Sequence, residues 1–197
     1  MRRYRPAAAL ALVAAAAGCN FAARTGIVRK DILTDAQQVV ADTKINHGDM
    51  TIQGAVDRAD RDYDIDQPIT LSVTASKDAH IAILRVLANG DTTIIFPNKQ
   101  HPKADIAANE TLTVPGPDDD VKLAVDKKQV VLFEFIASNT PGSWLFTRGP
   151  DKDSDFADLG GTTRAIARDI TNSLKVGKGP ETVASYLTVR VGGGSLF

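Results

Sequence analysis

The densest group of potential metal ligands is a set of aspartates between residues 57 and 66. Its members are Asp57, Asp60, Asp62, Asp64 and Asp66. In an extended segment the last four would share one face and could offer their carboxylate oxygens to Ca²⁺. The spacing does not fit an EF-hand, because neither the glycine nor the final glutamate of that loop is in place. Arg58 and Arg61 lie among the aspartates, so we predict a solvated, salt-bridged edge, with calcium binding as the alternative.

The histidines and the single cysteine do not form a transition-metal or catalytic motif. His47, His80 and His101 are far apart in the sequence, without a His-Glu-x-x-His or Cys-x-x-Cys pattern. The sequence also has no Gly-x-Ser-x-Gly elbow, no Gly-x-x-x-x-Gly-Lys phosphate loop and no dinucleotide fingerprint. We therefore predict no catalytic residue, no cofactor and no enzymatic activity.

Two aromatic residues are the remaining candidates for a binding site. Trp144 and Phe146 follow a turn at Pro141-Gly142. An exposed tryptophan beside a loop is typical of contacts with proteins or glycans. The alternative is core packing, because Trp144-Leu145-Phe146 also fits a strand, and this is the simpler interpretation.

The N-terminus has the parts of a bacterial export signal. Three arginines within the first five residues precede an apolar run over residues 7–17, which is too short to span a membrane. The run ends in Ala16-Ala17-Gly18-Cys19, which resembles the bacterial lipobox with alanine where leucine is most frequent. Cys19 is the only cysteine, and exported proteins use cysteines mostly in pairs. We predict a lipoprotein acylated at Cys19, with a plain secretory signal as the alternative.

Acylation would determine where the protein acts and what it meets. Two or three acyl chains give stable membrane anchoring. Asn20 follows the cysteine, and by the sorting rule of enteric bacteria this resembles an outer-membrane lipoprotein, facing the periplasm or the surface. The net charge of −1 gives no basic surface for nucleic acid. The predicted partners are therefore the membrane, through the lipid anchor, and a protein of the envelope.

The elements that would hold these residues are mainly strands. Residues 69–74 alternate apolar and hydroxyl side chains, and residues 130–136 are almost continuously apolar, as expected of a central strand. Asn89-Gly90 predicts a hairpin with a type I′ turn. Residues 163–174 form the one convincing helix, with an apolar stripe spaced by four. The predicted fold is an antiparallel β-sandwich of immunoglobulin-like architecture with one helix near the C-terminus.

Changes in composition along the chain predict its organisation. We assign residues 1–18 to the signal peptide and residues 19–48 to a lipid-anchored tether with at most one weak helix. The β-sandwich domain, including the C-terminal helix and strand, would span residues 49–192, and residues 193–197 would form a flexible tail.

The stretch from Asp62 to Phe146 resembles a bacterial module known as domain of unknown function 4384. The resemblance is carried by the strand that follows Gln67-Pro68, the hairpin at Asn89-Gly90 and the motif Phe96-Pro97-Asn98. It covers less than half of the chain. It implies a β-sandwich with a binding or assembly role, found in envelope lipoproteins, and it carries over no catalytic residue.

These observations predict an envelope-anchored lipoprotein that acts as a non-catalytic interaction or assembly module. The alternative is a periplasmic or surface lipoprotein that binds a cell-wall glycan or a small molecule. That ligand would be bound by Trp144 and nearby loop residues.

Overall fold

The structure is a computed structural model that describes residues 32–43, 45–175 and 179–193. Strands make up 35% and helices 14%, so the protein is mainly β, as the sequence predicts. Among the described residues, no helix is both long and apolar enough to cross a membrane.

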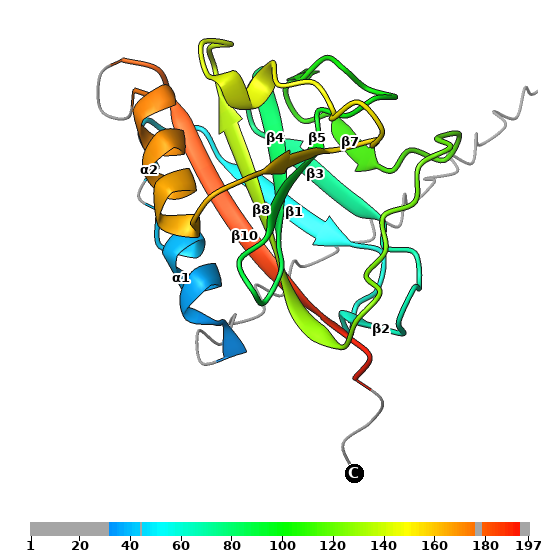
Figure 1. Ribbon diagram of the computed structural model, residues 1–197. Coiled ribbons are helices and arrows are strands. Elements are labelled where there is room, and N and C mark those ends of the chain that lie inside the picture. Colours follow the sequence, from blue (N-terminus) through cyan, green and yellow to red (C-terminus); the bar gives the residue numbers. More distant parts are fainter. Residues whose placement is uncertain (1–31, 44, 176–178, 194–197) are drawn as a thin grey trace, which may run out of the picture.

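The strands form a large and a small sheet (Figure 1). The large sheet contains β2 (Asp62–Tyr63), β4 (Ala79–Val86), β5 (Thr92–Phe96), β6 (Asp105–Ile106), β8 (Gln129–Ser138), β9 (Ala157–Leu159) and β10 (Thr182–Val191). The small sheet contains β1 (Ile52–Val56), β3 (Leu71–Ala75) and β7 (Thr111–Val114). The strand orders are β2-β10-β8-β4-β5-β9, with β6 pairing beside β4, and β1-β3-β7.

Strand β8 is the centre of the large sheet, which confirms the prediction for residues 130–136. It pairs antiparallel with β10 along its whole length and with β4 on its other edge. Eight of its ten residues are buried. A strand covered on both faces and paired on both edges is where a continuous apolar run belongs.

The predicted hairpin joins β4 to β5, but its turn is not of type I′. A type I′ turn needs a positive φ at both central residues, whereas here Gly90 has a φ of +95° and Asn89 does not have a positive φ. The N–H of Leu87 donates to the carbonyl of Asp91, at 2.9 Å, which closes a longer, three-residue loop. The Asn89 side chain accepts from the N–H of Asp91 and stabilises that loop.

The prediction of a wholly antiparallel sandwich is wrong for the large sheet, which is mixed. β2 pairs parallel with β10 over two residue pairs, Arg190 with Asp62 and Val191 with Tyr63. A bidentate ion pair reinforces this contact, because Arg190 donates to both Asp62 oxygens at 2.7 Å. The side-chain alternation of a strand does not encode the direction of a partner more than a hundred residues away.

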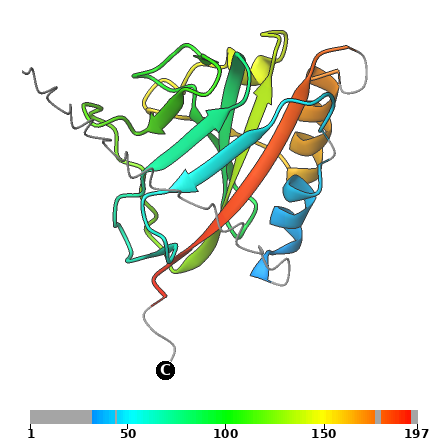
Figure 2. The ribbon, with the colours of Figure 1, turned by 180° about the vertical axis from the view of Figure 1, so that it is seen from behind.

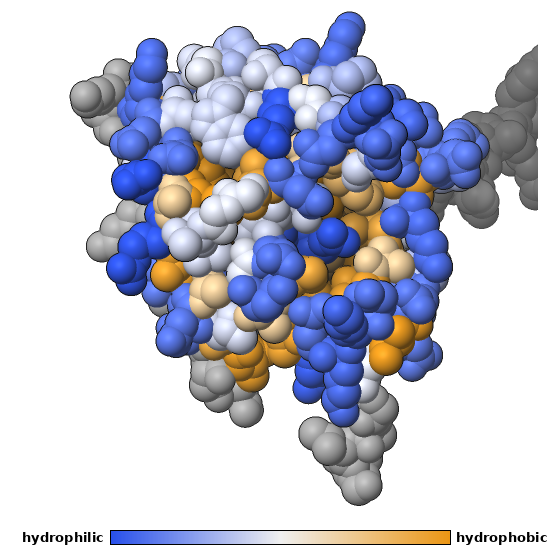
Figure 3. Space-filling model, viewed as in Figure 1, coloured by the Kyte–Doolittle hydropathy of each residue, from blue (hydrophilic) through white to orange (hydrophobic). Residues whose placement is uncertain are grey.

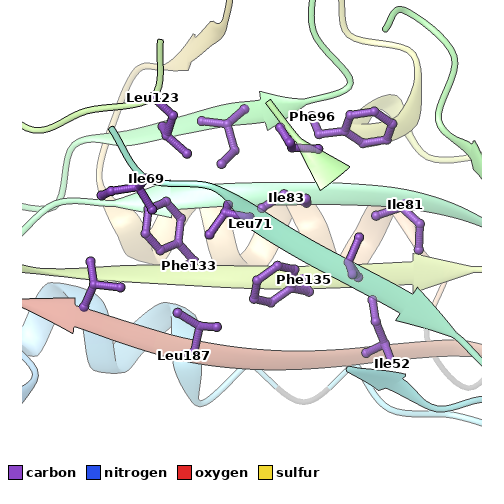
Figure 4. Close-up of a cluster of buried hydrophobic side chains, with 14 of the residues drawn as sticks. Ile52, Ile69, Leu71, Ile81, Ile83, Phe96, Leu123, Phe133, Phe135 and Leu187 are labelled. Atoms are coloured by element: carbon purple, nitrogen blue, oxygen red, sulfur yellow. The ribbon is translucent and has the colours of Figure 1, made fainter. Parts of the chain in front are cut away.

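One core lies between the two sheets. Ile52 and Leu71 from the small sheet pack against Ile83, Phe133 and Phe135 from the large sheet (Figure 4). The alternation predicted for β3 is confirmed, since its buried residues face this core.

Two helices cover the opposite face of the large sheet: α1 (Asp35–Ala41) and α2 (Thr163–Ser173). Figures 1 and 2 both show them one after the other along the β10 side. The predicted helix α2 is confirmed: Thr162 caps it, and Ile166 and Ile170 are buried against the sheet. The protein therefore has three layers: small sheet, large sheet and helices.

Helix α1 lies in the segment that the sequence assigns to a tether. Thr34 and Gln37 form a capping box at its start. The Gln37 side chain is buried, and its amide donates to the carbonyls of Val86 and Val130 at 3.1 and 3.0 Å. In the described residues, packing thus begins at Leu33, ahead of residue 49, where the sequence predicts the domain to start.

Candidate functional site

The predicted acylation site lies outside the described residues. This holds for Cys19, for the predicted signal peptide and for the tail from residue 194 onward.

The aspartates between residues 57 and 66 are not gathered into one ligand set. Asp62 is held by Arg190, Asp60 pairs with Arg58 at 3.1 Å, and Asp57 accepts from the Tyr63 hydroxyl at 2.7 Å. The side chains of Asp64 and Asp66 are exposed. In the part of the chain that the structure describes, no group of three or more His, Cys, Asp or Glu side chains is positioned to hold a metal ion.

Trp144 and Phe146 lie on a short 3₁₀ helix, η2 (Trp144–Phe146), and not on the strand that the apolar run suggests. Ser143 caps this helix by accepting from the N–H of Leu145 at 3.3 Å. Three apolar residues are too few for their periodicity to distinguish a helical turn from a strand.

The two aromatic side chains have different environments. Phe146 is buried, and its ring centroid lies 5.9 Å from that of His80, so Phe146 belongs to the core. Trp144 is half-buried and borders an open pocket. The structure therefore favours core packing for Phe146 and leaves Trp144 as a candidate contact residue.

The Trp144 pocket is a hollow of about 330 Å³ formed where η2, the end of β9 and α2 meet. Its lining residues are Trp144, Arg148, Leu159, Gly160, Ile166 and Asp169. The Arg148 guanidinium donates to the carbonyl of Asp158 at 3.0 Å, which fixes it at the rim. A Cβ added at Gly160 would meet no atom within 4 Å, so this wall is open. The pocket combines an aromatic ring, aliphatic walls, a cation and an anion.

A second hollow, of about 410 Å³, surrounds the pair of His80 and Asp105, whose Nδ1 and Oδ1 atoms lie 2.5 Å apart. This pair links β4 to β6, in which His80 and Asp105 are opposite each other, and the N–H of the neighbouring Ile81 donates to the carbonyl of Ala104 at 2.8 Å. Asp78, also in the lining, accepts from the N–H of Ala108 at 2.8 Å. These polar groups hold neighbouring loops in place, so we assign them a structural role.

A third hollow contains a residue that the sequence analysis did not single out. Glu134 lies in the middle of β8 and is only 2% exposed. Its Oε2 atom has no hydrogen-bond partner, and burial raises the pKa of the carboxyl to about 8. The sequence contained the signal, because Glu134 is the single charged residue in an otherwise apolar strand. Buried ionisable groups of this kind are candidates for functional sites.

Arg85, a partly buried cation of the large sheet, does not neutralise Glu134. Leu84 is opposite Glu134 in the pairing of β4 with β8, and alternation turns the next residue, Arg85, to the other face of the sheet. There the Arg85 guanidinium donates to Thr93 at 3.3 Å. Desolvation by burial lowers the pKa of Arg85.

The middle of the chain is similar to a known protein family. Residues 62–141 match the family model described as Domain of unknown function (DUF4384). They form a DUF4384 domain. The match runs from β2 to the turn after β8, which confirms the resemblance drawn from the sequence. No curated protein matches the chain, and no solved structure matches it.

The motif that carries the resemblance to the DUF4384 family has a structural role here. Asn98 of Phe96-Pro97-Asn98 is buried, and its amide donates to the carbonyl of Ile95 at 3.1 Å. Its oxygen accepts from the N–H groups of Gln100 and His101 at 3.0 and 2.9 Å. Asn98 thus shapes the loop after β5. Glu134 lies inside the DUF4384 domain, whereas every residue of the Trp144 pocket lies outside it.

Proposed function

We propose that the chain is an envelope-anchored lipoprotein that acts as a non-catalytic interaction or assembly module. The support for the anchor comes from the sequence: a basic start, a short apolar run and the lipobox-like Ala16-Ala17-Gly18-Cys19. Cys19 would carry the acyl chains, and Asn20 after it favours the outer membrane. The DUF4384 domain also supports this role, because such modules occur in envelope lipoproteins.

We also propose that the two sheets form a sandwich of immunoglobulin-like architecture. Two sheets around a common core support an immunoglobulin-like scaffold, in which loops at one end make the contacts. The helical layer on the large sheet would be an addition to that scaffold.

The observation that carries the proposal is the Trp144 pocket. Tryptophan and arginine are the residues most enriched at the energetic centres of protein interfaces, especially where aliphatic side chains form a dry surrounding. Trp144 and Arg148 stand together here, with Leu159 and Ile166 beside them. The molecular surface in Figure 3 is largely hydrophilic, with apolar side chains visible in separate places. A local, pocket-centred contact with an envelope protein fits such a surface.

The second candidate is a cell-wall glycan or small molecule at the same pocket. An aromatic ring can stack on the apolar face of a sugar, while Arg148 and Asp169 supply a donor and an acceptor for its hydroxyl groups. Trp144 is the only tryptophan of the chain, so its fluorescence reports on this pocket alone.

A pocket-filling variant tests the proposal and separates the two candidates. Gly160→Leu should fill the pocket, and Gly142→Leu is the matched control, because an added Cβ meets open space at both sites. A photo-crosslinking residue at position 165, which is partly exposed and lies one turn before Asp169 on the same side of α2, should capture an envelope protein in the wild type and the control. Gly160→Leu should lose this adduct.

The outcome has three branches. An adduct that Gly160→Leu leaves unchanged would rule out the pocket as the contact. Absence of an adduct, together with a shift of Trp144 emission on adding cell-wall glycan fragments, would replace the protein partner with the glycan. Absence of both would overturn the proposal for this site.

A further inference from the structure

The hollow that contains Glu134 lies on the helical face of the large sheet, between the end of α1 and β10. Its volume is about 440 Å³. Its lining residues are Ala41, Thr43, Asn46, Glu134, Ala184, Ser185 and Tyr186. We call it the Glu134 pocket. It shares no residue with the Trp144 pocket.

Strand register fixes the position of the carboxyl. Glu134 is opposite Tyr186 of β10 on one side and Leu84 of β4 on the other. Leu84 and Ile136 belong to the cluster that the helices cover, so Glu134 points to the same face by alternation. The side chain therefore rises from the rigid centre of the sheet into a pocket whose upper wall is the chain just after α1.

The lining residues do not provide a donor for Oε2 of Glu134. Asn46 uses its side-chain oxygen to accept from the N–H of Ala184 at 2.9 Å, and the Thr43 hydroxyl donates to the carbonyl of Val39 at 3.0 Å. Among the residues that the structure describes, the lining contains no lysine, arginine or histidine. A buried acceptor without a donor is unfavourable, and it becomes favourable when an occupant brings N–H groups.

We propose that the Glu134 pocket binds an ammonium group, carried either by a small free amine or by a lysine side chain of a partner. An ammonium supplies three donors and a positive charge, which the described lining residues do not offer. Its N–H groups would pair with the Glu134 carboxylate, and the oxygens of Thr43 and Tyr186 in the lining can accept the others. The pocket volume is sufficient for a short alkylamine.

Binding is coupled to a proton. Burial keeps the pKa of Glu134 at about 8, so the empty pocket holds the neutral acid at pH 7. When an ammonium enters, the acid loses its proton to solvent and becomes the carboxylate that pairs with the unchanged ammonium, so one proton is released for each amine bound. Tyr186 is the only other titratable residue among the lining residues that the structure describes. The apparent Kd should therefore fall about tenfold per pH unit as the pH rises towards 8 and then level off.

Calorimetry with butylamine tests the proposal on the full domain. Titrations at pH 6, 7 and 8, in two buffers of different ionisation heat, give both the Kd and the number of protons released. Nα-acetyl-lysine amide, whose side-chain ammonium is free, is the second ligand and represents the lysine of a partner. Butanol is the neutral control and should not bind.

Glu134→Gln is the matched variant, because it keeps the shape of the neutral acid and should fold as well as the wild type. It should weaken amine binding at pH 8 at least tenfold and remove the proton release. Tyr186→Phe keeps the carboxyl and should retain the proton release. Binding of butylamine identifies a free amine, and binding of the lysine derivative alone identifies a partner. Equal affinity of wild type and Glu134→Gln, or no binding of either amine, would overturn the proposal.

Discussion

Glu134 makes the stability of the protein depend on pH in an unusual direction. Its pKa rises from an ordinary value of 4.5 to about 8 on folding, so the native state binds a proton that the unfolded state has lost. The free energy of unfolding should therefore decrease with rising pH between these two values, by about 1.4 kcal/mol per pH unit, and then level off. Urea unfolding at pH 5 to 9 measures this dependence.

The matched variant for this prediction is again Glu134→Gln. The difference in the free energy of unfolding between wild type and variant should decrease with rising pH by the same amount, because all other titrating groups are shared. A difference that stays constant from pH 5 to 8 would contradict a raised pKa for Glu134 in the native state.

Gly54 permits a close contact between the two sheets. A Cβ added there would lie 2.2 Å from the Phe135 ring, and a ring in the core cannot move away freely. We expect Gly54→Ala to lower the free energy of unfolding by about 1–3 kcal/mol through overpacking.

Urea unfolding of the double variant Gly54→Ala/Phe135→Leu checks the cause. If the clash is with the ring, the double variant should be less destabilised than the sum of the two single changes. Gly142→Ala is the control, because its added Cβ meets open space. Strict additivity would show that some other contact of residue 54 is responsible.

Among the elements, α1 depends on one buried side chain. Gln37 joins the helix to the ends of two strands through the carbonyls of Val86 and Val130. Gln37→Ala leaves both carbonyls without this donor, and we expect a loss of about 1–3 kcal/mol. Hydrogen exchange should accelerate first at the amides of α1. Gln100→Ala, at an exposed glutamine, should change neither quantity.

The success of sequence-based prediction followed the length of each element. Helix α2 and strand β8 were predicted correctly because eleven and ten residues contain enough periodicity. The three residues of η2 do not, and they were interpreted as a strand. Helix α1 has only seven residues, and its burial depends on tertiary contacts of Gln37 that no local pattern reveals.

The sequence can indicate the key residue of a candidate site, but it does not reveal the pocket in which that residue lies. Trp144 was named from the sequence, whereas its pocket also needs walls from β9 and α2, which follow it in the chain. Glu134 does not stand out in the sequence as a site residue, because one charge in an apolar run leaves the prediction of a central strand unchanged. The walls of its pocket come from Ala41, Thr43 and Asn46 after α1 and from residues 184–186 of β10, which lie far from Glu134 in the sequence and meet it only in the folded chain.

At the scale of the whole molecule, the anchor is the first feature to establish. Intact mass of the full-length protein from its host should show loss of residues 1–18 and a gain of about two to three acyl chains. Cys19→Ser should lack the gain. An unmodified wild-type protein would remove the lipoprotein proposal and leave a secreted domain.

The DUF4384 domain should not fold by itself when cut at its matched limits. Residues 62–141 lack β10, which pairs with β8 along ten residues, and they lack the helices that cover Leu84, Ile94 and Ile136. An unpaired central strand and an exposed apolar face favour aggregation. Urea unfolding should be cooperative for residues 32–193 and absent for residues 62–141. A cooperative transition in the shorter chain would contradict this.

The position of β10 shows that the stretch matched by the family model is not a complete structural unit. The stretch that matches the family model ends at residue 141, yet the sheet to which it contributes is completed by a strand that begins at residue 182. Within this chain, the sheet face of the matched stretch is therefore covered by segments that lie outside the match. The Trp144 pocket is built entirely from such flanking segments. Recognition at that pocket, as proposed above, would therefore depend on parts of the chain that the family match does not include.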